Sequence, residues 1–319
     1  MKPIWKEIGL AVLFGMVLPW VVLNLYIHCN KAVPEPTIAP GTEPMQEGKQ
    51  LTMYLRRGDG EVTETDMDDY LTGVLLGELP ATFEPEAKKA QAVAARTFAW
   101  KAVVTGGKHG DGSVCTESTC CQAYVNPGQY SGSPEAVQEA RQAVEATSGL
   151  VLYYDGSLIE ATYFSCSGGS TEDAVAVWGT SFPYLRATVS TGEENAVHFT
   201  DTVTYTKQEL ESLLGISLSG RPDTWIGLTT YTAGRGIATM EICGHTFQGT
   251  ELRSLLKLRS TAITVSVKAD GLEFTTRGYG HRVGMSQYGA EAMAVAGATY
   301  EEILAHYYRG TVIGEAAEN

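Results

Sequence analysis

The sequence has few positive charges for its length, and no stretch of it interleaves basic with aromatic residues. Its 319 residues include 23 Lys and Arg against 37 Asp and Glu, which gives a formal net charge of −14. Proteins that bind DNA or RNA present basic surfaces to the phosphate groups. The charge balance and its distribution therefore exclude a nucleic-acid-binding protein.

The sequence also lacks internal repeats and two common functional motifs, which excludes further classes of protein. No internal repeat is visible, and the Gly-rich segment at residues 278–290 lacks the surrounding strand, helix and strand of a dinucleotide-binding loop. The Ser-rich stretch at residues 165–172 is not a nucleophile elbow, which places one Ser between glycines. With 44% apolar and 19% charged residues, the chain suits a folded globular protein large enough to need no disulfide staples.

The N-terminus contains a long run without charge. From Ile8 to Ile27 no side chain is charged, and a helix of about 20 residues spans roughly 30 Å, the thickness of a bilayer core. Lys2 and Lys6 precede the run, so the positive-inside rule predicts that residues 1–7 stay in the cytoplasm and that residues 8–28 form a transmembrane anchor. The alternative is a cleaved signal peptide, but no small-x-small cleavage site follows.

Beyond the anchor, the composition predicts a tether and one folded domain. Four prolines and few large apolar residues indicate an extended linker at residues 29–48. Residues 49–319 then form the extracytoplasmic domain. Its hairpins are more evident than its crossover units, so we expect an α+β fold of mixed helices and short antiparallel strands around a substrate cleft.

Turn and cap signals place the elements of this domain. Hairpins are predicted where Gly58-Asp59-Gly60 joins residues 51–57 to 61–65, and where Asp155-Gly156 joins residues 150–154 to 157–164. Helices are predicted from cap residues and prolines, and strands from apolar β-branched runs. The predicted helices start after Asp66, Pro85, Ser133 and Thr206 and cover residues 285–296 and 300–308, and further strands lie at residues 228–232, 237–242 and 262–276.

Glu78 is the first candidate for chemistry. It follows the predicted helix end at Gly77 and lies between Leu76 and Leu79. A carboxyl group beside apolar side chains has its charged form disfavoured, so its pKa rises and it can hold a proton for a leaving oxygen. The alternative is an ordinary surface glutamate in a loop.

His109, Cys115, Cys120 and Cys121 lie within thirteen residues, next to a Gly-rich loop. An imidazole and two or three thiolates at this spacing can hold Zn²⁺ in tetrahedral geometry. The even gaps favour His109, Cys115 and Cys121 as ligands, with Cys120 as a spare. The alternative is a disulfide from Cys115 to Cys120 or Cys121.

Two polar loops are candidates for binding substrate. Ser165 and Ser167 stand in a loop that offers hydroxyls and backbone amides to a polar ligand such as a sugar. The segment Gly278–Ala290 is expected to place its polar side chains at the mouth of a cleft: His281, Gln287 and Tyr288. A tight turn selected for backbone reasons is the alternative for both loops.

Together these motifs resemble the stage II sporulation protein D family of lytic transglycosylases. The resemblance rests on Tyr70–Ala99, which includes Gly77-Glu78-Leu79-Pro80, and on the two polar loops, Ser165–Glu172 and Gly278–Ala290. It spans roughly residues 50–312 in the family's order, and an anchor with an external domain is also typical of that family. The closing segment departs from the family at Arg282, where members commonly have Gly.

The resemblance implies roles for particular residues. Glu78 would be the catalytic acid, and Arg96, Tyr184 and Arg186 would lie along or near the substrate path. Glycosidases normally use two carboxylates, but a lytic transglycosylase needs no external water. Glu78 would protonate the glycosidic oxygen after N-acetylmuramic acid and then deprotonate the sugar's own C6 hydroxyl, leaving a 1,6-anhydro end. Zinc would then rigidify the cleft wall instead of attacking the substrate.

The resemblance also implies a biological setting. The substrate would be peptidoglycan glycan strands stripped of stem peptides, cut during septal wall remodelling and engulfment in endospore formation. The protein would lie in the mother-cell membrane facing the forespore septum, with a sporulation amidase and engulfment membrane proteins as partners. Two other functions stay open: a zinc-dependent cell-wall hydrolase, and a non-catalytic glycan-binding module that recruits an amidase.

The acidic composition adds one expectation about the cleft. Peptidoglycan is itself acidic, so a uniformly negative protein would repel it over roughly a Debye length of 8 Å. We therefore expect the cleft to be less acidic than the rest of the surface. Arg96, Arg186 and Arg282 are the predicted counter-charges.

Overall fold

The structure, a computed structural model, describes residues 51–317. The predicted anchor at residues 8–28 and the predicted linker at residues 29–48 lie outside this range. Within it, no helix is both long enough and apolar enough to cross a bilayer. The described residues belong to one unit, and their mixture of helices and short strands confirms the expected α+β class.

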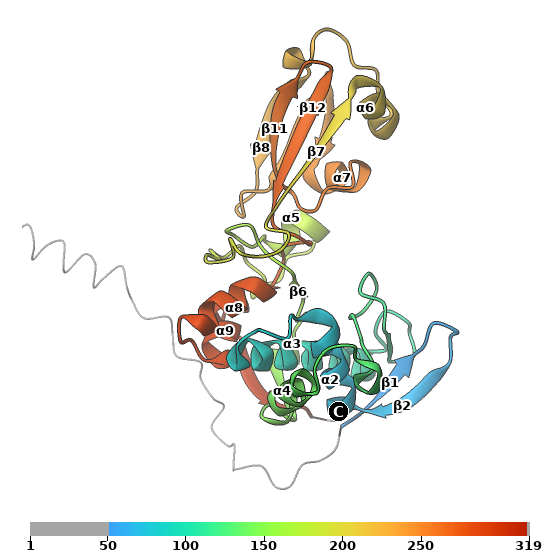
Figure 1. The fold of residues 1–319 in the computed structure, drawn as a ribbon, viewed down its shortest axis with the longest axis vertical. Helices are drawn as coiled ribbons and strands as arrows, with labels where there is room; N and C mark the ends of the chain where they lie inside the picture. The colour runs from blue at the N-terminus through green and yellow to red at the C-terminus, as the bar shows by residue number, and fades with distance from the viewer. Residues whose placement is uncertain (1–50, 318–319) are drawn as a thin grey trace, which may run out of the picture. The chain divides into compact units, whose positions relative to one another are not determined.

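This unit contains two lobes, which we define by residue range. The helical lobe comprises residues 51–164 and 278–317, and the sheet lobe comprises residues 200–277; residues 165–199 connect them (Figure 1). The sheet lobe has an apolar core of its own. Two further cores belong to the helical lobe, and one of them also takes in residues of the connector.

The chain enters and leaves the sheet lobe at one place. The amide of Gly278 donates a hydrogen bond to the carbonyl oxygen of Phe199 at 2.8 Å. The whole sheet lobe is therefore inserted between two adjacent points of the chain.

The helical lobe opens with the predicted hairpin. β1 (Thr52–Arg56) pairs antiparallel with β2 (Val62–Asp66), and β3 (Ser113–Cys115) joins β1 in parallel. The Asp66 side chain then caps α2 (Met67–Glu78) by accepting a hydrogen bond from the amide three residues on, at 2.9 Å. Both predictions from the local sequence are confirmed here.

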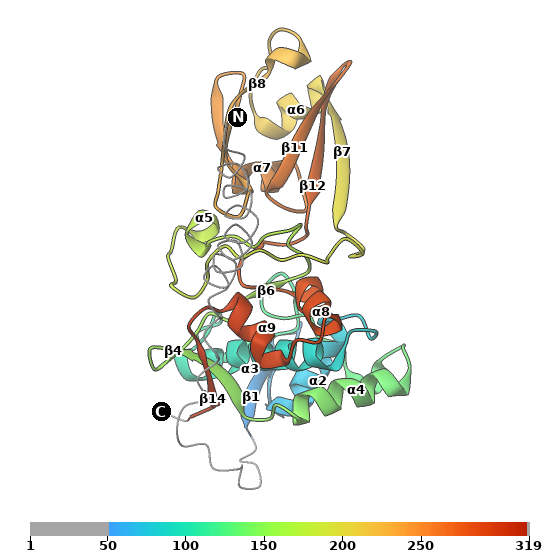
Figure 2. The same cartoon turned by 90° about the vertical axis from the view of Figure 1, so that its left-hand side faces the viewer.

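α3 (Pro85–Thr105) is the central helix of this lobe. It begins at a proline and ends before a left-handed glycine, as predicted. Its fully buried face carries small side chains: Ala87, Ala90 and Ala94. Because these side chains are small, α8 (Gln287–Val295) and α9 (Tyr300–Tyr307) can pack closely beside α3 (Figure 2).

The remaining elements of the helical lobe flank α3. α4 (Pro134–Glu145) is capped by Ser133, as predicted. β4 (Leu150–Tyr154) turns through Asp155-Gly156 into β5 (Ser157–Leu158), and β14 (Val312–Glu315) pairs with the other edge of β4.

The second strand of that predicted hairpin is shorter than expected. Residues 157–164 were predicted as one strand, but only β5 pairs with β4. After a turn, β6 (Tyr163–Phe164) pairs in parallel with β13 (Met285–Ser286). The Ile159 amide still donates to the Leu152 carbonyl oxygen of β4 at 3.2 Å, and the chain then leaves β4 where the Thr162 amide turns back to the Glu160 carbonyl oxygen at 2.9 Å.

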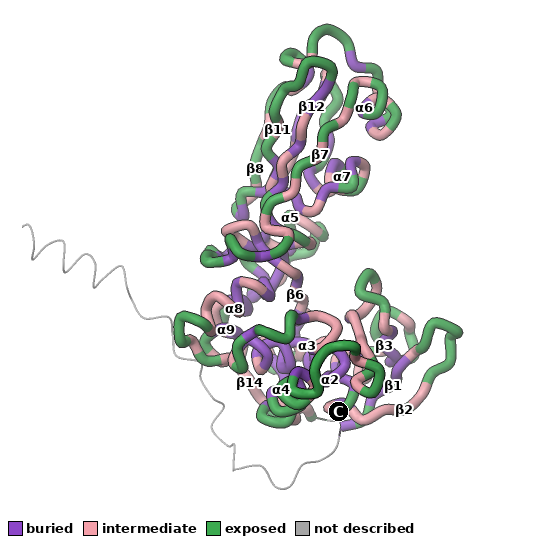
Figure 3. The backbone as a smooth tube through the Cα atoms, in the orientation of Figure 1, coloured by how far each residue is buried: buried purple, intermediate pink, exposed green. Residues whose placement is uncertain are grey.

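The sheet lobe contains two three-stranded antiparallel sheets with two short helices, and a further helix, α5 (Ala174–Trp178), lies in the connector. Along β12 buried residues alternate with residues of intermediate exposure, and along β7 intermediate residues alternate with exposed ones (Figure 3). Its elements are β7 (Thr200–Thr206), α6 (Lys207–Leu214), β8 (Ile226–Tyr231), β9 (Ile237–Ile242), β10 (His245–Gln248), α7 (Gly249–Leu255), β11 (Ala262–Lys268) and β12 (Gly271–Arg277).

Two features of this lobe differ from the prediction. The single strand predicted at residues 262–276 is a hairpin, because the chain turns at residues 269 and 270 between β11 and β12. The strands β7 and β10 and the helix α7 were not predicted. The capping box at Thr206 and Glu209, by contrast, starts α6 as expected.

Candidate functional site

Glu78 is the last residue of α2, where the helix stops two residues before Pro80. Its carboxyl group is half-buried and is held at both oxygens. Oε1 accepts a hydrogen bond from the Ala123 amide at 2.7 Å, and Oε2 accepts one from Nε2 of Gln287 at 3.0 Å. Neither donor carries a charge, so the carboxyl group is oriented without an ion pair.

This environment changes the acidity of Glu78. Burial raises the pKa of its carboxyl group, and the two hydrogen bonds oppose that rise without cancelling it. The carboxyl also lies at the C-terminal end of α2, where the helix dipole disfavours a negative charge. Glu78 therefore retains its proton to a higher pH than an exposed glutamate does.

The segment after the cysteines forms the wall behind Glu78. Gly77 lies so close to it that a Cβ atom there would stand 2.9 Å from the backbone of Ala123. Gln122 is buried, accepts a hydrogen bond from the Tyr70 hydroxyl at 2.9 Å and donates one to the Tyr163 hydroxyl at 2.7 Å. Nothing in the sequence patterns pointed to Gln122, Tyr70 or Tyr163 as neighbours of the site.

Both tyrosines are neutral. Burial is the main cause that raises the pKa of Tyr70 and of Tyr163, and the nearby Glu78 carboxyl raises both further. The wall behind the carboxyl group is therefore polar and hydrogen-bonded but uncharged.

The predicted metal ligands come together. One donor atom from each of His109, Cys115, Cys120 and Cys121 lies within 4.8 Å of all the others. Cys121 Sγ lies 3.6 Å from His109 Nε2, and Cys120 Sγ lies 3.9 Å from both the imidazole nitrogen and Cys121 Sγ. These three cysteines are free thiols, so the alternative disulfide is not formed.

These separations match the edges of a zinc tetrahedron. Zn–S bonds of about 2.3 Å place two sulfur ligands about 3.8 Å apart. The donor set of one imidazole and three thiols therefore fits Zn²⁺. Cys120 lies as close as the others, and the geometry gives no reason to treat it as the spare.

One short segment carries both Cys121 of the metal-ligand cluster and Ala123, whose amide binds Glu78. Cys121 is two residues before Ala123, whose amide binds the carboxyl group. Any group that fixed the cysteines would therefore also fix the hydrogen-bond donor to Glu78.

Of the predicted glycan contacts in the two polar loops, Gln287 and Ser167 are buried, whereas Ser165 and Tyr288 are half-buried. Gln287 touches Glu78, and Tyr288 packs edge-on against Phe83 at 5.1 Å between ring centroids. Ser165 accepts the Tyr288 amide through its carbonyl oxygen at 3.0 Å, which ties the two polar loops together. Ser167 is fully buried and donates to Glu193, so it supports the loop and has no surface for a glycan.

His281 lies between the rings of Phe164 and Trp178. Its Nδ1 atom accepts the Val283 amide at 3.1 Å. Burial lowers the pKa of His281 to about 4, with Arg253 contributing in the same direction. The ring is neutral at neutral pH and does not serve as a cationic contact.

The predicted role of Arg96 is corrected. Its side chain has no exposed surface, pairs with Asp68 at 3.0 Å, and donates to the carbonyl oxygens of Val144 and Thr147 at the end of α4. It therefore locks α3 to α2 and α4 inside the helical lobe, where no substrate can reach it.

Tyr184 and Arg186 also differ from each other in access. The Tyr184 side chain is buried, and its hydroxyl accepts the Glu160 amide at 3.0 Å. Arg186 is half-exposed and lies 3.3 Å from Asp173. Of these two predicted contacts, only Arg186 has a charged group that solvent reaches.

Arg282 adopts a backbone conformation that favours glycine, with φ at 65°. This explains why Gly suits the position. Its buried guanidinium pairs with Glu172 at 3.0 Å and donates to the carbonyl oxygens of Ser167, Ser170 and Gly234. The predicted role as a counter-charge for substrate is therefore wrong, because Glu172 already neutralises this arginine.

Sequence comparisons match this chain to sporulation proteins and to an Amidase enhancer. Residues 56–154 match the family described as Stage II sporulation protein. The Stage II sporulation protein D of Bacillus subtilis (strain 168) is 35% identical over 97% of this chain and 95% of its own length. That of Bacillus amyloliquefaciens is 35% identical over 99% and 97%. The Amidase enhancer of Bacillus subtilis (strain 168) is 31% identical over 76% of this chain and 40% of its own length.

Proposed function

The chain belongs to the stage II sporulation protein D family, and we propose that it is a lytic transglycosylase that cleaves peptidoglycan glycan strands after N-acetylmuramic acid. The family is one of sporulation proteins, and the similarity to an Amidase enhancer is compatible with a role at the cell wall. The observation that carries the proposal is the half-buried Glu78 carboxyl, oriented by two neutral donors and with its pKa raised.

The proposed reaction uses Glu78 twice. In its protonated form it donates to the glycosidic oxygen as the bond from C1 to that oxygen breaks, and the leaving sugar keeps the proton. The resulting carboxylate then accepts the proton of the C6 hydroxyl as the C6 oxygen bonds to C1, which closes a 1,6-anhydro ring. The proton count of Glu78 is restored, and no water is consumed.

The neighbours of Glu78 support both halves of this cycle. Burial favours the protonated form that the first step needs. The donors at Ala123 and Gln287 stabilise the carboxylate that the first step produces. Their fixed geometry limits the carboxyl group to one orientation against the glycan.

Zinc is part of the proposal as a structural ion. His109, Cys115, Cys120 and Cys121 would hold it, and it would supply a rigid cross-link between these ligands. By fixing Cys121, such a cross-link would hold the nearby Ala123 amide in place against Glu78. In this proposal Glu78, and not the zinc ion, carries out the proton transfers.

One other function has support of its own. The similarity to an Amidase enhancer fits a glycan-binding module that assists an amidase without cutting the strand. A zinc-dependent hydrolase is the third possibility, and it would require the metal for turnover and would leave reducing ends.

The Glu78→Gln variant separates these functions. It keeps the shape and an acceptor oxygen for the Ala123 amide, but its amide group carries no acidic proton, so we expect 1,6-anhydro products to fall at least 100-fold. Mass spectrometry of digested glycan strands measures those ends directly. Glu291→Gln is the matched control, since Glu291 also has a raised pKa and accepts a backbone amide. Undiminished anhydro product from Glu78→Gln would contradict the proposal.

We also propose a cellular setting, by resemblance to this family. We place the protein in the mother-cell membrane facing the forespore septum, held by an anchor at residues 8–28, with residues 49–319 outside. Its partners would be a sporulation amidase, engulfment membrane proteins and strands stripped of stem peptides. Protease added to intact protoplasts should remove the folded domain, and protection of that domain would contradict this orientation.

A further inference from the structure

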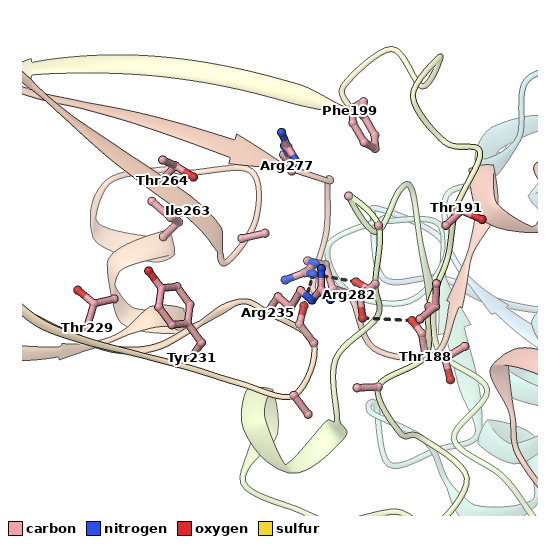
Figure 4. Close-up of a pocket in the computed structure, with 18 of the residues that line it drawn as sticks. Thr188, Thr191, Phe199, Thr229, Tyr231, Arg235, Ile263, Thr264, Arg277 and Arg282 are labelled. Carbon is pink, nitrogen blue, oxygen red and sulfur yellow. Dashed lines mark hydrogen bonds between the residues drawn. The ribbon is translucent and has the colours of Figure 1, made fainter. Parts of the chain in front are cut away.

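A large cavity lies away from Glu78, where the connector meets the sheet lobe. Its volume is about 960 Å³, and it is lined by the loops Gly168–Ser170 and Ala187–Val189, the tip of the β8–β9 hairpin and the strands β11 and β12. Figure 4 shows its labelled side chains. Neither Glu78 nor any of its hydrogen-bond partners lines this space.

The lining of this cavity is positively charged, whereas the protein as a whole is negatively charged. Its lining contains four arginines and one acidic residue, Glu194, in a chain of net charge −14. We call it the arginine pocket, after Arg235, Arg277, Arg282 and Arg309. Such a concentration of one sign focuses the field onto an anionic ligand.

Three of these arginines are available to a ligand. Arg235, Arg277 and Arg309 are exposed, and no carboxylate of residues 51–317 lies within ion-pair distance of them. Arg309 is steadied by hydrogen bonds to the Ala187 carbonyl oxygen and the Thr188 hydroxyl, at 3.2 and 2.8 Å. Only Arg282 is already neutralised.

The hairpin tip that carries Arg235 is fixed by buried contacts. Arg235 adopts a left-handed conformation with φ at 63°, and its amide donates to the Thr232 carbonyl oxygen at 3.1 Å. The neighbouring Gly234 carbonyl oxygen accepts Arg282 at 2.8 Å, and the Gly236 amide donates to Glu172 at 3.0 Å. The tip is therefore preorganised, which lowers the entropy lost on binding.

The rest of the lining suits a sugar. Threonine hydroxyls and aromatic rings line it, a combination that can hydrogen-bond to ring hydroxyls and cover an apolar sugar face. The side chains concerned are Thr188, Thr191, Phe199, Thr229, Tyr231 and Thr264 (Figure 4). Exposed cations beside such a surface indicate a carbohydrate that carries a carboxylate.

The arginine pocket and Glu78 are joined through the two polar loops. Arg277 directly precedes the segment that ends at Gln287, the donor to Glu78. Gly168, which lines the pocket, belongs to the loop Ser165–Glu172, whose Ser165 carbonyl oxygen accepts the Tyr288 amide. A ligand in the pocket therefore lies against the start of the loop whose Gln287 donates to Glu78, and against the loop that is hydrogen-bonded to it at Tyr288.

We propose that the arginine pocket is a distal binding site for the carboxylate of an acidic sugar in the glycan strand. The inference rests on the proposed function, because it assumes that the strand is the ligand. In N-acetylmuramic acid that carboxylate is the lactyl group, which is free when no peptide is attached and becomes a neutral amide when one is. The pocket thus favours strands that carry free carboxylates.

The test measures binding separately from cleavage. Soluble peptide-free glycan strands are titrated calorimetrically into the full chain carrying Glu78→Gln, alongside the same strands with their carboxylates reduced to alcohols. We expect reduction to weaken binding about 10-fold, and Arg235→Gln with Arg277→Gln to weaken binding of the native strands by a similar factor. The reduced strands should bind this double variant and the parent equally.

The matched control is Arg221→Gln, an exposed arginine of the sheet lobe that pairs with Asp223 outside the pocket. It should bind native strands as the parent does. Equal binding of native and reduced strands, or an unaffected double variant, would overturn the proposal. Equally tight binding of a polyglycerol phosphate would also overturn it, by showing an unselective anion site. Charge-dependent binding by the Glu78→Gln chain, together with no anhydro product from the wild-type chain, would uphold the pocket and reject the transglycosylase.

Discussion

At the scale of single residues, the half-buried Glu78 carboxyl has one property that experiment can isolate. Burial raises its pKa, whereas the Ala123 amide and the Gln287 side chain lower it. The balance between these effects sets the pH range in which the acid form exists. Sequence reasoning predicted the apolar flank correctly but could not supply the two donors, which lie 45 and 209 positions away.

The first prediction concerns pH. Because the folded-state pKa of Glu78 is raised, the native state binds a proton that the unfolded state releases at lower pH. The resulting stabilisation is present below the unfolded pKa of about 4.3 and is lost as the pH rises through the folded pKa. Glu78→Gln does not lose this stabilisation as the pH rises. The melting temperature of the variant minus that of the wild type should therefore increase from pH 4 to pH 8. A constant difference across that range would contradict the raised pKa.

The pH dependence of glycan cleavage should also follow the titration of Glu78. Cleavage needs the protonated form, so the rate should fall as the pH rises through the folded pKa. Gln287→Leu removes one donor to the carboxylate, which should move that fall to higher pH while lowering the maximum rate. The pH profile of anhydro-product formation checks both effects, and a profile unchanged by Gln287→Leu would mean that the contact is not made in solution.

At the scale of elements, α2 and the segment at residues 120–124 form one support for Glu78. The contact of Gly77 with Ala123 holds them together closely enough that no side chain fits between them. Gln122 adds hydrogen bonds to Tyr70 and Tyr163 beneath the carboxyl group. The metal-ligand cluster lies at the start of this segment.

The second prediction concerns metal. Purified protein should contain about one zinc per chain, and removing it with a chelator should lower the melting temperature by about 8 °C, as expected for an ion present at about 1,000 times its dissociation constant. Cys121→Ser should reproduce both the zinc loss and the lower melting temperature. Cys243→Ser, at a free thiol of the sheet lobe, is the control and should retain the metal. Full stability without zinc would remove its structural role.

Elements with strong local signals were predicted well, and those without them were not. Asp66, Pro85 and the Thr206 capping box start helices because the cap and the first turn are local in the sequence. β7, by contrast, is rich in threonine and is defined by pairing with β12, some 70 residues away. No local pattern encodes such a partner.

At the scale of the whole molecule, a buried ion pair holds the two lobes together. Arg282 belongs to the helical lobe and Glu172 to the connector, and both side chains are 1% exposed. Their hydrogen bonds reach Gly234 and Gly236 in the sheet lobe. The prediction that Arg282 contacts the substrate failed because sequence alone does not reveal its buried carboxylate partner, Glu172.

The third prediction tests this ion pair. Arg282→Met leaves the Glu172 carboxylate buried and unpaired, which should lower the free energy of unfolding by about 3–5 kcal/mol. Adding Glu172→Gln should restore a large part of that loss. Arg282→Gly relieves the left-handed backbone but loses the same pair, so it should be only about 1 kcal/mol better than Arg282→Met. Urea unfolding measures all three, and a loss under 1 kcal/mol for Arg282→Met would show that the pair contributes little.

The adjacency of Phe199 and Gly278 has a consequence for how such chains can change over generations. Because one hydrogen bond joins the entry and exit points of the sheet lobe, the parts of residues 200–277 away from Gly234 and Gly236 can lengthen, shorten or be exchanged without re-threading the helical lobe. A lineage can thus alter what the arginine pocket recognises while leaving the Glu78 environment as it is. Selection on recognition and selection on chemistry then act on separate stretches of the gene.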